Sequence, residues 1–122
     1  MSRHNVDLGK WGEQLAESTL VQAGATILAR NFRSDPGEID LVIEHDGDIV
    51  AVEVKTRTDF DLEAPEEAVT WWKLRRMSHG LATYAMTNDL MERHWRLDVV
   101  AIQLDLNGDV LRCEHIRDAY LG

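Results

Sequence analysis

Two neighbouring segments of alternating apolar and polar residues, 38–45 and 48–56, constrain the fold more than any other feature of this sequence. Alternation with a period of two is typical of β-strands, because successive side chains point to opposite faces of a sheet. Between the segments stands Asp46-Gly47, a dipeptide that favours a two-residue type I′ hairpin turn. The sequence therefore predicts an antiparallel hairpin with an apolar face that should be core. That face carries Ile39, Leu41, Ile43, Val50, Val52 and Val54.

The other face of this hairpin carries charged residues. A turn at Asp46-Gly47 places Asp40 opposite Glu53. By the same count Glu38 falls opposite Lys55. Side chains directly opposite each other are about 5 Å apart at Cβ, where two carboxylates repel unless a cation or a proton lies between them. The pair therefore predicts a site for a divalent ion such as Mg²⁺, which prefers carboxylate oxygens.

Two alternatives remain open at this hairpin. A turn one residue later, at Gly47-Asp48, would place Asp40 opposite Lys55, still on the same face. A half-exposed hairpin with a solvated, mixed-charge outer face would show the same alternation without any site. If the site is real, Lys55 is the candidate to position or help deprotonate a water for attack on phosphorus.

The remaining sequence predicts two helices and three more strands. One helix is expected from an Asp7 cap to a stop at Gly24, and another from Pro65, where Glu66 and Glu67 suit the positive end of a helix dipole. The apolar stripes of the two helices are Leu8, Trp11, Leu15 and Leu20, and Leu74, Met77, Leu81 and Tyr84. The further strands are 26–32, 94–104 and 109–115, with turns at Asp35-Pro36-Gly37 and Asn107-Gly108. The predicted order is α-β-β-β-α-β-β.

Length, charge and cysteine content limit the class of protein. The 122 residues fit a single domain, 1–122, because no repeat or linker divides them. Cys113 is the one cysteine, which favours a reducing cytoplasm. The apolar runs fall far short of the ~20 residues of a membrane-spanning helix, so we expect no membrane partner. The net charge of −9 argues against nucleic acid, but acids gather in 35–67 while Lys and Arg prevail in 68–97, so one face can still attract phosphate.

Several short blocks along the chain resemble a known family. They are Gly9-x-x-Gly12-Glu13, Arg30-Asn31-x-Arg33, Gly37-Glu38-Ile39-Asp40-Leu41, Val52-Glu53-Val54-Lys55-Thr56-Arg57, Lys73, and Arg96-x-Asp98-Val99-Val100. In this order and spacing they are similar to the bacterial YraN family (UPF0102), from about Gly9 to Tyr120. That family resembles the PD-(D/E)xK nuclease superfamily, which includes restriction endonucleases and archaeal Holliday-junction resolvases. The resemblance implies an α/β fold with a restriction-endonuclease-like α-β-β-β-α-β core, an extra C-terminal strand, and a central mixed sheet flanked by helices.

The resemblance also implies roles for individual residues. Asp40 stands at the metal-binding acid, and Glu53 and Lys55 stand at the two named positions of (D/E)xK. Glu13 stands at the first-helix acid that some relatives add to the metal site. Lys73 stands where superfamily members often place a basic residue of the second core helix. The implied cofactor is Mg²⁺ or Mn²⁺, and the implied partner is DNA.

Further side chains are candidates for contacts with nucleic acid. The cations Arg57, Lys73, Arg76 and Arg96 either hold phosphates or are solvated charges. Trp71, Trp72 and Trp95 could stack on bases. Because side chains of adjacent helix residues diverge by about 100°, we expect at least one of Trp71 and Trp72 in the core. Glu38 either tunes Lys55 or forms only a salt bridge with it.

The leading hypothesis is a Mg²⁺-dependent endonuclease that hydrolyses phosphodiester bonds in DNA, branched or single-stranded. The alternative is a non-catalytic nucleic-acid-binding or protein-interaction module with the same fold. A subunit activated by a protein partner is a third reading, and the sequence does not decide between a monomer and a homodimer. The retained set Asp40, Glu53 and Lys55 favours catalysis, because an inactive module has no physical need to hold these charges together.

Overall fold

The computed structural model describes residues 2–35, 37–58 and 64–119, with side chains from Leu8 onward. Within these ranges the elements, in chain order, are α1 (Ser2–Gln22), β1 (Thr26–Ser34), β2 (Gly37–His45), β3 (Asp48–Thr58), η1 (Pro65–Ala68), α2 (Trp71–Thr87), β4 (Trp95–Leu104) and β5 (Val110–Ile116). The predicted order of helices and strands is confirmed, with the short 3₁₀ helix η1 added before α2. Among the described residues, none of the helices is long and apolar enough to cross a membrane.

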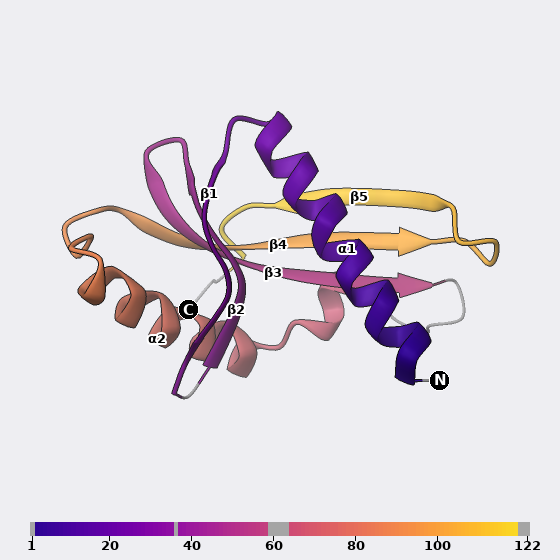
Figure 1. Ribbon diagram of the computed structural model, residues 1–122, viewed down its shortest axis with the longest axis horizontal. Coiled ribbons are helices and arrows are strands. Elements are labelled where there is room, and N and C mark those ends of the chain that lie inside the picture. Colours follow the sequence, from indigo (N-terminus) through magenta and orange to yellow (C-terminus); the bar gives the residue numbers. More distant parts are fainter. Residues whose placement is uncertain (1, 36, 59–63, 120–122) are drawn as a thin grey trace.

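The five strands form one mixed sheet in the order β1-β2-β3-β4-β5. Strands β3 and β4 are parallel, and every other neighbouring pair is antiparallel. Helix α1 crosses one face of the sheet and α2 packs against the other (Figure 1). In the same view the β1–β2 hairpin runs steeply across the direction of β3, β4 and β5 (Figure 1). The predicted α/β class with a mixed sheet flanked by helices is therefore confirmed.

The core has two parts, one on each face of the sheet. Leu41, Ile43, Val50 and Val52 pack against α1, as predicted for the apolar face of the hairpin. The opposite face of the hairpin was expected to be either a functional site or exposed to solvent. Much of this face is instead buried against α2. Its apolar residues are Ile39, Val42, Ile49, Ala51 and Leu97, which pack on Leu74, Met77 and Leu81. Ile39 was expected on the same face as Leu41, and this prediction is wrong: Ile39 packs on the α2 side, beyond the end of the β2–β3 ladder at Leu41 and Val52.

Helix α1 lies unusually close to β3. A Cβ added at Gly12 would stand 2.2 Å from the Oγ1 of Thr56, so only a glycine permits this approach. The buried side of α1 continues through Ala16 and Leu20, whereas Trp11 keeps 39% of its surface exposed. The helix already begins at Ser2, so the predicted cap at Asp7 is wrong. Leu8, Leu15 and Leu20 of the predicted stripe pack in the core as expected, Trp11 does not, and Gly12 and Ala16 allow the close approach of α1.

The turn between β2 and β3 has the predicted form. Asp46 and Gly47 both adopt positive φ, at 52° and 85°, and His45 pairs with Asp48. These are the requirements of a type I′ turn. The predicted register is confirmed from this turn back to the pair Leu41 and Val52, and the slipped alternative is excluded.

The turn between β4 and β5 differs from the predicted form. Of Asn107 and Gly108, only Gly108 has positive φ, at 87°. The side chain of Asp105 accepts hydrogen bonds from the backbone N–H groups of Asn107 and Asp109, each at 2.9 Å. The hairpin is confirmed, but Asp105 closes a longer loop because its carboxylate offers the backbone additional acceptors. The predicted turn at 35–37 is closed by pairing of Ser34 with Gly37, and Pro36 lies outside the described residues.

The second helix begins later than predicted. Pro65 starts the 3₁₀ helix η1, with Glu66 and Glu67 in its first turn. The α-helix starts at Trp71 after Thr70, whose hydroxyl accepts a hydrogen bond from the N–H of Lys73 at 3.1 Å. Threonine is a preferred N-cap residue, and here it determines the start of α2. The predicted stripe of Leu74, Met77 and Leu81 is buried as expected.

Candidate active site

The candidate site lies where β2 and β3 separate. Their ladder ends at the pair Leu41 and Val52, so Asp40 and Glu53 are not directly paired, contrary to the predicted register. Instead, the Oδ2 of Asp40 accepts a hydrogen bond of 2.9 Å from the backbone N–H of Val54. The Asp40 carboxylate thus accepts the hydrogen bond that a backbone carbonyl of β2 would accept if the ladder continued. Asp40 remains near Glu53, because each of these two carboxyls changes the pKa of the other.

Gly37 allows the start of β2 to lie close to α2. A Cβ at this position would stand 2.9 Å from the carbonyl oxygen of Arg76 on α2. Because Gly37 has no side chain, the start of β2 can pack closely against α2. This part of β2 does not pair with β3. The opening between the two strands is where Asp40 turns its carboxylate toward β3.

Glu53 is a buried carboxyl with an unmet need for a partner. Its exposed fraction is 5%, and its Oε1 has no hydrogen-bond partner among the residues that the structure describes. The nearest cation is the Nζ of Lys73, 3.7 Å from Oε1, which is an ion pair beyond hydrogen-bond distance. Burial and the neighbouring Asp40 charge raise the pKa of Glu53 to about 7. In the absence of another cation, this carboxyl is held close to its protonated form.

Two further acids share this electrostatic environment. Burial raises the pKa of Asp40, although the N–H of Val54 and the neighbouring Glu53 lower it in part. Burial also raises the pKa of Glu13 on α1, and the charges of Asp40 and Glu38 raise it further. Glu13 is therefore within electrostatic reach of Asp40, and its role at a metal site stays a prediction.

A polar hollow of about 470 Å³ opens beside these acids, between α1 and the second half of β3. Glu13 lines it from the helix, and Lys55 and Arg57 line it from the strand. The charge of Lys55 lowers the pKa of Glu53, so this lysine lies within electrostatic reach of the acid pair. The hollow therefore lies on the side of the candidate site that carries Glu13 and Lys55.

Glu38 does not stand where the sequence predicts it, whereas the position of Arg76 agrees with either predicted role. Glu38 forms an ion pair of 2.8 Å with Arg33, its neighbour across β1 and β2. The prediction that Glu38 stands opposite Lys55 is wrong, because the first residues of β2 no longer pair with β3. Arg76 is exposed on α2, where it remains available to a ligand.

The residues present fit a divalent cation with oxygen ligands. Among the described residues, no cluster of three or more His, Cys, Asp or Glu side chains could hold a metal on its own. Mg²⁺ is often bound through one or two carboxylates together with substrate phosphate, which is what Asp40 and Glu53 can supply. A cation at this point would give the buried Oε1 of Glu53 a partner. It would also lower the raised pKa of that side chain, because a nearby positive charge favours the ionised carboxylate.

Comparison with known proteins gives the family. The model of the Uncharacterised protein family UPF0102 matches residues 12–102. A UPF0102 protein of Roseiflexus castenholzii is 39% identical over 117 residues, which cover 95% of this chain and 94% of that protein. UPF0102 proteins of Rhodococcus opacus and Rhodococcus jostii are 42% and 43% identical over 120 residues, covering 96% of this chain and 98% of each relative. The chain belongs to the UPF0102 family. Every candidate site residue lies within the span that the UPF0102 model matches.

Arg96, a predicted phosphate contact within the UPF0102 span, is instead part of a buried network. It is 7% exposed and donates hydrogen bonds to Asp48 at 2.9 Å and to Asp98 at 3.0 Å. Its Nη2 also lies 2.7 Å from the Nδ1 of His45, which must accept because a guanidinium only donates. Burial alone would raise the pKa of Asp98, but hydrogen bonds from His115 and Arg96 hold it below its usual value. The prediction for Arg96 is therefore wrong, because its donors are already used inside the fold.

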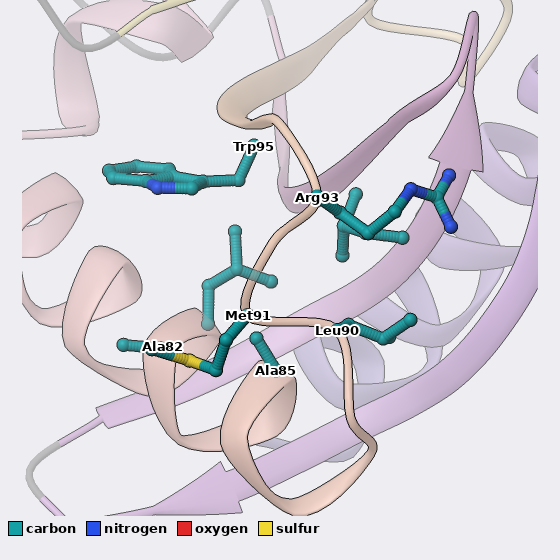
Figure 2. A pocket seen from close by; sticks show the side chains of 8 residues that line it. Ala82, Ala85, Leu90, Met91, Arg93 and Trp95 are labelled. Carbon is teal, nitrogen blue, oxygen red and sulfur yellow. The ribbon is translucent and has the colours of Figure 1, made fainter.

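A second concave feature lies apart from the acids, between α2 and the start of β4 (Figure 2). It is lined by Ile49, Leu81, Ala82, Ala85, Leu90, Met91, Arg93 and Trp95. The guanidinium of Arg93 points away from the hollow in Figure 2, and it binds Glu44 and the carbonyl of Gly47. Because its lining offers no carboxylate, we do not place the candidate chemistry of this UPF0102 protein there.

The contact between Lys73 and Glu53 is the site feature that the sequence reasoning missed. Lys73 was expected to bind phosphate, and nothing in the spacing of the two residues along the chain indicates that they meet. The residues that could have indicated this contact are Gly37 and Thr70. Gly37 allows β2 to approach α2 closely, and Thr70 determines where α2 begins.

Proposed function

We propose that this protein is a Mg²⁺- or Mn²⁺-dependent nuclease that hydrolyses phosphodiester bonds in DNA. The observation that carries the proposal is the buried pair Asp40 and Glu53, with an unpartnered carboxyl oxygen on Glu53. Lys55 and Lys73 lie within electrostatic reach of this pair. The likeness of the motif residues to the PD-(D/E)xK nucleases supports the same reaction, and the element order agrees with it.

The ligands for the cation would be Asp40 and Glu53. Asp40 is already oriented, because the N–H of Val54 fixes one of its oxygens at 2.9 Å. Glu13 faces the same position from α1 and adds negative charge to it. A divalent ion bound there offsets the charge that develops on the phosphate in the transition state.

Two lysines have separate tasks in this proposal. Lys55 lines the polar hollow, where its Nζ can hold a water by a hydrogen bond and orient it toward phosphorus. Lys73 partly neutralises Glu53 in the protein alone, at 3.7 Å, and can turn to a phosphate oxygen of the substrate. Arg57 lines the hollow beside Lys55 and provides a further cation for the DNA backbone.

The same geometry also favours a second function to a smaller extent, a nucleic-acid-binding module without catalysis. The observation in its favour is the ion pair between Lys73 and Glu53, which supplies a cation to the acid pair from within the chain. This ion pair leaves Glu53 Oε1 without a hydrogen bond, so it satisfies the carboxyl less well than a bound cation.

The test is cleavage of linear duplex, single-stranded, flap and four-way-junction DNA with Mg²⁺ and with Mn²⁺. Lys55→Ala should lower the cleavage rate by about 100-fold while leaving affinity largely unchanged, because water orientation contributes in the transition state. Lys10→Ala removes an exposed lysine of α1 and should retain the wild-type rate. Equal cleavage by wild type and Lys55→Ala would exclude this site, and binding of DNA without cleavage would favour the binding module.

A further inference from the structure

Trp71 and Trp72 are both exposed at the first turn of α2. Their exposed fractions are 45% and 65%, so the prediction that one of them belongs to the core is wrong. The two indole rings meet edge to face, with centroids 4.6 Å apart and planes at 84°. Thr70 caps the helix immediately before them, so both indoles stand on a fixed backbone. Adjacent exposed tryptophans of this kind mark a binding surface, because water contact with so much apolar area is unfavourable.

The Lys and Arg side chains of the helix that carries the tryptophan pair give that helix a positive charge. Helix α2 contains Lys73, Arg75 and Arg76 and no acidic residue, in a chain whose net charge is −9. The guanidinium of Arg75 lies 5.4 Å from the centroid of the Trp71 ring, which is a cation–π contact. Arg75 and Arg76 are both exposed. An aromatic surface bordered by cations fits a ligand with flat rings and a negatively charged backbone.

The pair also lies next to the candidate active site. Trp72 is followed directly by Lys73, whose Nζ is 3.7 Å from the Oε1 of Glu53. Trp71, Trp72 and Lys73 belong to the first turn of α2, which rises about 1.5 Å per residue, so a strand of a few nucleotides can reach from the Trp72 ring to Lys73. Trp95 does not lie near the candidate site in this way. It lines the hollow between α2 and β4, whose lining contains none of the acids of the candidate site.

We propose that Trp71 and Trp72, with Arg75 and Arg76, form a stacking platform for an unpaired base of single-stranded nucleic acid. The inference rests on the proposed function and names its substrate class: strands with unstacked bases beside the phosphate to be cut, such as single strands and flaps. Duplex DNA offers no free base face to Trp72, because its bases are already stacked on one another. Trp71 is braced by Arg75 and by the edge contact, which leaves the more exposed Trp72 as the contact to the base.

The test is binding of a labelled oligothymidine of about 15 nucleotides, measured by fluorescence anisotropy in EDTA so that no strand is cut. Trp72→Ala should weaken this binding about tenfold or more, and Trp72→Phe should restore most of it, because a smaller aromatic ring still stacks. Binding of a blunt duplex should change little in either variant. Trp95→Ala is the matched control and should bind oligothymidine like the wild type.

Two results would overturn the platform: equal binding of oligothymidine by Trp72→Ala and wild type, or an equal loss of single-strand and duplex binding. Light scattering distinguishes another occupant, because a dimer that becomes a monomer in Trp72→Ala would mean that a second copy of the chain covers the pair. The measurement does not depend on cleavage. Selective loss of single-strand binding without any nuclease activity would retain the platform and reject only the proposed reaction.

Discussion

At the scale of single residues, Glu53 is the most informative position in the molecule. A carboxyl that is 5% exposed and has an unpartnered oxygen costs folding free energy unless a proton or a cation compensates it. The charge of Asp40 raises the pKa of Glu53 further, and Lys73 and Lys55 offset it only in part. A protein that retains this arrangement loses stability at the site, and such costs are typical of functional positions.

The raised pKa of Glu53 predicts how stability depends on pH. The value is about 7 in the folded protein against 4.5 ordinarily, so between these pH values the folded state holds a proton that the unfolded chain has released. The free energy of unfolding should therefore fall as pH rises through this window, by about 3 kcal/mol at most. Urea denaturation of wild type and Glu53→Gln between about pH 5 and pH 8 measures it. The variant should have the flatter profile, and parallel profiles would mean that Glu53 ionises normally.

The residues of the site show what sequence could and could not predict. Alternation and the Asp46-Gly47 turn were sufficient to bring Asp40 near Glu53 and to predict the register from Leu41 to His45. They could not predict that the β2–β3 pairing ends after this point, where the start of β2 lies close to Arg76 of α2, a residue far away in sequence. The meeting of Lys73 with Glu53 and the burial of Arg96 depend on tertiary packing in the same way.

At the scale of elements, the position of α1 against β3 determines whether Glu13 reaches the acid pair. Gly12 stands next to Glu13, and the absence of its side chain allows the helix to contact Thr56 directly. The start of each helix was harder to predict than its apolar residues. Asp7 and Pro65 both carry typical start signals, but α1 begins at Ser2 and the Thr70 cap begins α2.

Helix packing at Gly12 can be tested against Gly9 in the same helix. Gly12→Ala should lower the free energy of unfolding by about 1–3 kcal/mol, because its Cβ would overlap the Thr56 hydroxyl at 2.2 Å. Gly9→Ala has no atom within 4 Å of its Cβ and should be neutral or stabilise by up to about 1 kcal/mol, through helix propensity. Urea denaturation gives both values. In a Thr56→Ala background the cost of Gly12→Ala should shrink, and an unchanged cost would place the strain elsewhere.

At the scale of the whole molecule, the cations divide into those that hold the fold and those that face solvent. Arg96 lies inside a network with Asp48, Asp98 and His45 near the starts of β3 and β4. Arg76 lies on the exposed side of α2, beside the tryptophan pair. In the proposed function nucleic acid approaches at α2 in spite of the net charge of −9, because the acids are concentrated in another part of the chain.

Two arginine variants should separate these roles. Arg96→Ala should lower the free energy of unfolding by about 3–5 kcal/mol, because it leaves the buried Asp98 without its main cation. Arg76→Ala should change stability by less than about 0.5 kcal/mol and reduce the log–log salt dependence of DNA binding by about one unit. Thermal melts and binding isotherms at several salt concentrations measure both effects. A weaker salt dependence in Arg96→Ala but not in Arg76→Ala would reverse the assignment.

Binding of a divalent ion at the opening between β2 and β3 is the property on which the whole account depends, and calorimetric titration of Mn²⁺ into the metal-free protein tests it most directly. At about pH 8, where Glu53 is mostly ionised, wild type should bind Mn²⁺ in a saturable manner. Asp40→Asn and Glu53→Gln should each abolish this binding, whereas Glu92→Gln, which removes an exposed acid before β4, should leave it intact. Identical isotherms for wild type and Asp40→Asn, or no heat of binding in any of the four proteins, would contradict the account.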